Sequence, residues 1–101
     1  MPVASSLRAF ATQTLTVDDT VGGVGLNLTY VLATPPAQAV VLTLATAQIR
    51  WFADGTAPTA TVGHQMNPTD VLTLNHPSEL FNFKAIRTGA VSGVGTVSYY
   101  R

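Results

Sequence analysis

The sequence predicts an all-β domain, either a β-sandwich or a small jelly roll of about seven short strands with no long helix. Stretches of alternating β-forming residues recur at a spacing of roughly 10 residues, and glycines, prolines and an Asp-Gly pair separate them. At 101 residues the chain is long enough for one core. We therefore expect a single β-sandwich domain over residues 7–101, preceded by a flexible arm over residues 1–6.

The first third of the chain predicts two strands. The Thr-rich alternation of residues 7–17 is typical of a strand with one polar face, and Asp18-Asp19 ends it. The glycines of residues 22–25 predict a loop or bulge that leads into a second strand over residues 26–32. Pro35-Pro36 closes this strand because proline cannot donate a hydrogen bond to a neighbouring strand.

Residues 39–53 form the longest β-forming run. Apolar residues alternate through it, which predicts two strand segments over residues 39–45 and 48–53 with a kink or bulge between them. Asp54-Gly55 then predicts a tight turn, because glycine supplies the positive φ that such turns require.

The last part of the chain predicts a loop, one helical turn and three strands. Pro58 favours an exposed loop over residues 56–67 with only a short edge segment. Residues 77–81 predict one helical turn with Ser78 as its N-cap. The remaining strands are expected over residues 71–74, 84–88 and 94–100.

Composition argues against several functional classes. Only 10% of the residues are charged, against roughly a quarter in an average domain, and the net charge is zero. Nucleic-acid binding is therefore not expected, since it needs a basic surface. No stretch approaches the roughly 20 apolar residues of a membrane span. With few charges, uncharged side chains must cover much of the surface, and we expect an oligomer or a protein partner.

Catalytic and metal-binding patterns are not recognisable. His64, His76, Asp54 and Asp70 have no fixed spacing, and we expect them to be surface loop residues. Cysteine is absent, and no G-x-S-x-G motif surrounds a serine. We expect no enzyme activity, no metal and no cofactor.

Aromatic residues allow two interpretations. Trp51, Tyr99 and Tyr100 could form a platform for a sugar ring, but core packing of Trp51 and one tyrosine is favoured because they lie in β-forming runs. Adjacent strand residues face opposite sides, so one of the two tyrosines should be exposed or lie at an interface.

Arg50 flanks Trp51 within an apolar strand. An arginine in such a position is usually paired, and Asp54 or Glu79 is the expected partner. The alternative is a salt bridge between subunits.

Several short motifs in the second half of the chain resemble a known group of proteins. The chain is similar to small all-β products of structural gene modules in tailed bacteriophages, and the resemblance extends from Ala47 to Tyr100. The residues that carry it are Ile49-Arg50-Trp51, Asp54-Gly55-Thr56, Pro58-Thr59, Gly63-His64, Phe83-Lys84-Ala85-Ile86-Arg87 and Val97-Ser98-Tyr99-Tyr100.

The resemblance implies a non-enzymatic structural protein of the virion. It points to a capsid cement or decoration protein that stabilises the head shell, binds the major capsid protein, forms a homotrimer and is assembled in the host bacterial cytoplasm. The alternative is a glycan-binding or adaptor module of the tail or baseplate. The candidate interface residues are Met1, Pro2, Val3, Arg50, Asp54, Pro58, His64 and Tyr100.

Overall fold

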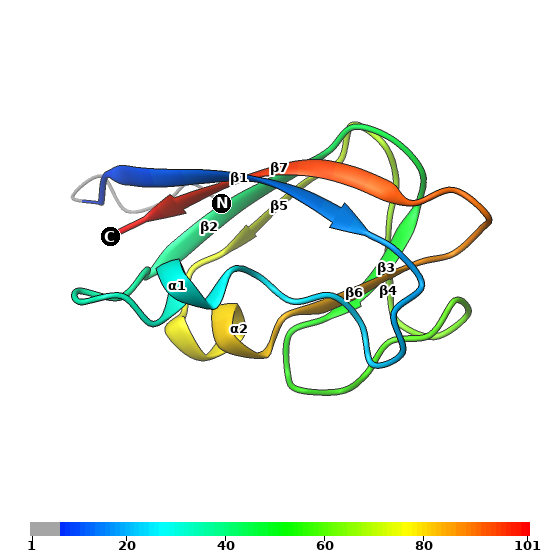
Figure 1. The fold of residues 1–101 in the computed structure, drawn as a ribbon, viewed down its shortest axis with the longest axis horizontal. Coiled ribbons are helices and arrows are strands. Elements are labelled where there is room, and N and C mark those ends of the chain that lie inside the picture. Colours follow the sequence, from blue (N-terminus) through cyan, green and yellow to red (C-terminus); the bar gives the residue numbers. More distant parts are fainter. Residues whose placement is uncertain (1–6) are drawn as a thin grey trace.

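The computed structural model describes residues 7–101 and contains two antiparallel sheets (Figure 1). The four-stranded sheet has the order β1-β7-β2-β5 and consists of Ala9–Val17, Gly93–Tyr100, Ala39–Leu44 and Val71–Leu74. The three-stranded sheet has the order β4-β3-β6 and consists of His64–Met66, Ile49–Phe52 and Lys84–Arg87. The expected all-β sandwich class is confirmed. The expected arm, residues 1–6, lies outside the described residues.

Two short helices complete the second layer. Figure 1 shows α1 (Leu28–Val31) and α2 (Pro77–Asn82) below one half of the four-stranded sheet, with the three-stranded sheet below its other end. A single hydrophobic cluster includes residues from both sheets and both helices. Its largest fully buried side chains are Tyr99, Phe83, Leu42, Ile49, Leu80, Val17, Val40 and Val97.

The long run of residues 39–53 connects the two sheets. Its first segment becomes β2 in the four-stranded sheet, and its second becomes β3 in the three-stranded sheet. Val40, Leu42 and Leu44 are buried, so the alternation of β2 places every second side chain in the core. The break that the sequence predicts between the two segments is therefore the point where the chain changes layer.

The strand expected over residues 26–32 is wrong, because this segment contains helix α1. Asn27 is the N-cap residue, and its side-chain oxygen accepts a hydrogen bond of 2.9 Å from the backbone N–H of Thr29. The ring of Tyr30 then packs 4.9 Å from the ring of Tyr99, measured between centroids. A short stretch of mainly apolar residues fits either a strand or one helical turn, and here the Asn27 cap favours the helix.

Helix α2 confirms the expected helical turn but not its expected cap. His76 is the N-cap, and its Nδ1 accepts a hydrogen bond of 3.2 Å from the backbone N–H of Ser78. Pro77 therefore occupies the first helical turn, where its missing N–H costs nothing. Leu80 fixes the helix in the core, where it is fully buried.

The expected loop over residues 56–67 ends in the short edge strand that the sequence predicts. This strand is β4, which pairs with β3 through Ile49 opposite Met66 and Trp51 opposite His64. The other side of β3 pairs with β6. The segment from β3 to β4 is thus a hairpin with a long connection.

Candidate interaction surface

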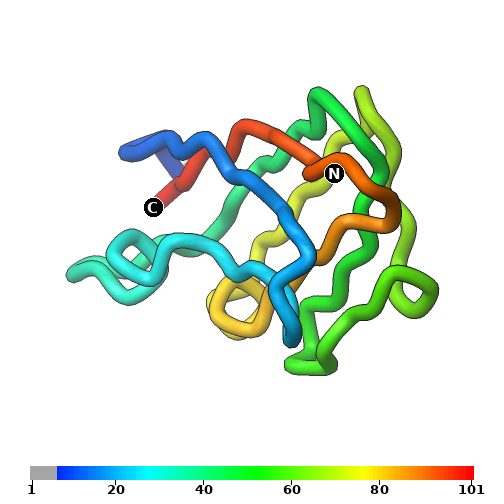
Figure 2. Tube along the Cα trace, turned by 45° about the vertical axis from the view of Figure 1, so that its right-hand side comes forward, coloured from blue at the N-terminus to red at the C-terminus, as the bar shows by residue number. Residues whose placement is uncertain are grey.

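The hairpin from Ile49 to Met66 holds four of the candidate interface residues: Arg50, Asp54, Pro58 and His64. Figure 2 shows the connection between β3 and β4 as green turns at the lower right edge of the molecule. Tyr100 lies apart from them at the end of β7 in the other sheet. Met1, Pro2 and Val3 lie outside the described part of the chain.

Arg50 fixes the connection of the hairpin. Its Nε donates a hydrogen bond of 3.2 Å to the carbonyl oxygen of Ala60, and its Nη1 donates one of 2.9 Å to that of Gly63. The expected pairing of Arg50 with Asp54 or Glu79 is wrong: Arg50 bonds to these backbone carbonyls, and the salt bridge found within residues 7–101 joins Arg87 to Asp19. A guanidinium group carries several donors in a fixed plane, so it can hold two carbonyls of one loop at once.

Gly63 allows the loop to approach β3 closely. Its φ is +140°, and a Cβ atom at this position would lie 3.1 Å from the Cβ of Arg50 and 3.3 Å from the backbone nitrogen of Trp51. A larger residue would push the loop away from the strand. The Gly63-His64 pair of the resemblance therefore has an architectural role.

Asp54 forms the turn that follows β3. Its Oδ1 accepts a hydrogen bond of 3.0 Å from the backbone N–H of Thr56, and Gly55 has a φ of +91°. The hydrogen bond from Thr56 lowers the pKa of the Asp54 carboxyl below its ordinary value. The expected Asp-Gly turn is confirmed, and the exposed carboxylate is held in place by it.

Pro58 is buried, although the sequence suggested it as an interface residue. The next residues form a tight turn in which Thr59 N–H donates to the Val62 carbonyl oxygen and Val62 N–H donates to the Thr59 carbonyl oxygen. The Thr59 hydroxyl also accepts from the backbone N–H of Val62 at 3.0 Å. This turn leaves the side chain of Val62 54% exposed, so Val62, not Pro58, is available for contact.

Trp51 packs between two other rings. Its ring centroid lies 4.8 Å from that of His64 and 6.0 Å from that of Phe83, with the Phe83 ring in a stacked arrangement. Trp51 is half-buried against the core, as the favoured interpretation expects. His64 is exposed and partly covers the indole from the β4 side.

The three aromatic residues suggested for a sugar platform do not form one surface. Tyr99 is fully buried, whereas Tyr100 is half-buried on the opposite side of β7. Trp51 belongs to the other sheet. Tyr99 is therefore the core tyrosine of the pair, and Tyr100 is the one that reaches the surface.

The hydroxyl group of Tyr99 makes a set of contacts that could not be predicted from the sequence. It accepts a hydrogen bond of 3.0 Å from the backbone N–H of Asn27 and donates a short one to the side-chain oxygen of Gln13. Burial raises the pKa of this hydroxyl. The three residues lie far apart in the chain, so no local pattern predicts their meeting.

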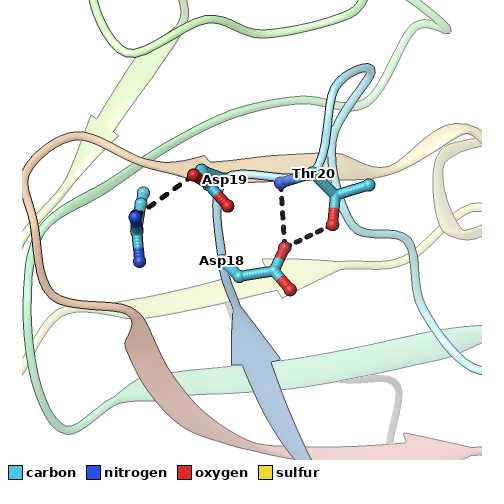
Figure 3. A network of polar contacts seen from close by, with 4 residues as sticks. Asp18, Asp19 and Thr20 are labelled. Atoms are coloured by element: carbon cyan, nitrogen blue, oxygen red, sulfur yellow. Dashed lines mark hydrogen bonds and ion pairs between the residues drawn. The ribbon is translucent and has the colours of Figure 1, made fainter.

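The loop after β1 is fixed by two acidic residues (Figure 3). The Oδ1 of Asp18 accepts hydrogen bonds from the backbone N–H of Thr20 at 2.9 Å and from its hydroxyl at 2.5 Å. Asp19 forms an ion pair of 3.2 Å with Arg87 on β6. The ion pair of Asp19 joins the end of β1 to the three-stranded sheet, whereas the contacts of Asp18 shape the loop itself.

Residues 7–101 contain no group of His, Asp and Glu side chains that could hold a metal ion, and no pocket. No helix among these residues has the length and apolar character needed to cross a membrane. Comparison of the chain with known protein families, with curated proteins and with solved structures finds no match.

Proposed function

We propose that the chain is a non-enzymatic structural protein of a bacteriophage virion, a capsid cement or decoration protein on the outside of the head shell. Its partner would be the major capsid protein, and it would assemble in the host bacterial cytoplasm as a homo-oligomer, for which the resemblance implies a trimer. The observation that carries the proposal is that four motifs of the resemblance build a single fixed hairpin, from Ile49 to His64.

The connection of this hairpin has the properties of a preformed protein-binding loop. Arg50 holds the connection by hydrogen bonds to two of its carbonyl oxygens. The connection begins with the turn at Asp54 and contains a second turn at Thr59. A loop held in this way loses little conformational entropy on binding. Asp54 is the one charged residue between positions 51 and 63, and a weakly charged surface suits contacts with another protein.

The amount of the protein in purified phage particles tests the proposal most directly. A cement protein should be present at a copy number comparable to that of the major capsid protein, as measured by quantitative mass spectrometry. A few copies per particle would instead support the adaptor or glycan-binding module of the tail. Absence from the particle would contradict both.

The role of the hairpin can be tested with Arg50→Met. This change removes both hydrogen bonds to the loop, so the loop should be cleaved faster by protease and the protein should sediment less with empty heads. Arg8→Met is the matched control, because it removes the same charge at an exposed position in front of β1. Equal binding of Arg50→Met and wild type would show that the hairpin is not the contact.

A further inference from the structure

The two sheets have four edges, and within residues 7–101 the edge formed by β1 is the longest and has no strand paired with its outer side. Strand β4 has three residues and β5 has four. The edge of β6 is covered by Val24, whose backbone exchanges hydrogen bonds of 2.7 and 2.9 Å with Ala85. Strand β1 has nine residues, and none of residues 7–101 pairs with the side that faces away from β7.

The register identifies which backbone groups of β1 point away from β7. The backbone N–H of Ala45 donates to the Val94 carbonyl oxygen. Successive residues of a strand direct their backbone groups to opposite neighbours, so those of Val94, Thr96 and Ser98 point toward β2. The residues between them therefore bond to β1, where Gly95 lies opposite Leu15 and Val97 lies opposite Gln13. It follows that the N–H and C=O groups of Thr12, Thr14 and Thr16 point outward from the sheet.

The regular part of this edge is symmetric about Thr14. A register shift between Ala9 and Ala11 interrupts the strand at its start, which leaves an unbroken ladder from Ala11 to Val17. Thr14 is the middle residue of this stretch. In an antiparallel pair of two copies, Thr14 would lie opposite itself and Thr12 opposite Thr16, so all three outward-facing positions would be occupied by threonine in both copies.

Beyond the register shift at its start, the edge over residues 9–17 has no charged residue and no proline that would prevent strands from pairing. These residue types are the usual protection of an exposed edge. The side chains of Thr12, Thr14 and Thr16 are exposed, and β-branched residues favour cross-strand contacts.

We propose that two copies of the chain associate through β1, antiparallel and about a twofold axis at Thr14. Three residue pairs would each exchange two backbone hydrogen bonds, and the two four-stranded sheets would become one of eight strands. This inference rests on the proposed self-association but not on the capsid assignment. The contact forms a dimer, whereas the trimer that the resemblance implies would need a head-to-tail contact such as β1 against β5.

The mass of the purified full-length protein tests this contact. Light scattering at high micromolar concentration should give about twice the 10.6 kDa of one chain. Thr14→Pro removes an outward N–H and introduces a ring at the centre of the contact, so the dimer dissociation constant should rise by about tenfold or more. Far-ultraviolet circular dichroism would show that the variant remains folded.

Thr73→Pro is the matched control on the opposite edge of the same sheet. Leu44 donates to the carbonyl oxygen of Asp70, so the register places the N–H of Thr73 on the outward side of β5. This variant should remain a dimer. If Thr73→Pro also dissociates, the copies associate head to tail and the twofold contact is wrong.

Charge substitutions at Thr14 test the twofold axis itself. Thr14→Lys and Thr14→Glu should each be monomeric, because the same charge from each copy would meet at the axis. An equimolar mixture of the two variants should form a heterodimer. A monomeric wild type, or a mixture that fails to pair, would overturn the proposal.

Discussion

At the scale of single residues, the hydroxyl of Tyr99 links three segments of the fold. Tyr99 is fully buried, yet its hydroxyl accepts from Asn27 and donates to Gln13. Through this one group, β7 is connected both to β1 and to the residue that caps α1. A buried polar group is tolerated in a core when it has such partners.

Tyr99→Phe should lower the free energy of unfolding by about 1 to 3 kcal/mol, because the N–H of Asn27 and the side chain of Gln13 lose their partner. Urea denaturation measures this change. Tyr100→Phe is the control, since the neighbouring tyrosine is half-buried on the other side of β7. Equal stability of the two variants would show that the buried hydroxyl contributes no more than the surface one.

The carboxyl of Asp18 should titrate below its ordinary value of 3.8, mainly because the Thr20 hydroxyl and backbone N–H donate to it. A carboxyl with a lowered pKa in the folded state stabilises the fold above the unfolded value, and the effect is lost as pH falls through the folded value. Thr20→Val should raise the pKa of Asp18 and reduce this acid-dependent loss of stability. NMR titration of the carboxyl measures the shift, and an unchanged pKa would show that the hydroxyl has no part in it.

At the scale of secondary structure, most strands could be predicted from the sequence because their signals are local. The alternation of residues 39–45, the Asp54-Gly55 turn and the strand over residues 71–74 each depend on a few neighbouring residues. The segment over residues 26–32 could not be predicted in this way. Its helical turn depends on the Asn27 cap and on the packing of Tyr30 against Tyr99, a residue far away in the chain.

The close packing of β7 against β2 depends on a glycine at position 95. A Cβ atom there would lie 2.5 Å from the carbonyl oxygen of Thr43 and 3.1 Å from Cδ1 of Leu42. Gly95→Ala should therefore destabilise the protein by about 1 to 3 kcal/mol. Gly89→Ala is the matched control, because no atom lies within 4 Å of a Cβ at that position. Urea denaturation that gave equal stability to both variants would show that β2 and β7 have room to separate.

At the scale of the whole molecule, the sequence indicates which segment forms the candidate surface but not how it is held. The motifs from Ile49 to His64 are close in the sequence, so their joint location in one hairpin could be expected. The hydrogen bonds of Arg50 to this loop could not be expected. Its partners are the backbone carbonyls of Ala60 and Gly63, and every residue type has a backbone carbonyl. The burial of Pro58 likewise depends on how the loop folds back.

The two layers should unfold together, because one hydrophobic cluster includes residues of both sheets. Leu42 lies in the four-stranded sheet and is 2% exposed, whereas Trp51 lies in the three-stranded sheet and is the single tryptophan of the chain. Leu42→Ala should reduce the free energy of unfolding by about 2 to 5 kcal/mol. The fluorescence of Trp51 reports the layer that does not contain the substitution.

In urea, the midpoint measured by Trp51 fluorescence should therefore fall by the same amount as the midpoint measured by far-ultraviolet circular dichroism. Coincident midpoints in the wild type and in Leu42→Ala would show that the loss of a contact in one sheet destabilises the other sheet as well. If Leu42→Ala lowers the circular dichroism midpoint and leaves the fluorescence midpoint unchanged, the three-stranded sheet and its hairpin unfold as a separate unit. The hairpin would then not depend on the four-stranded sheet for its stability.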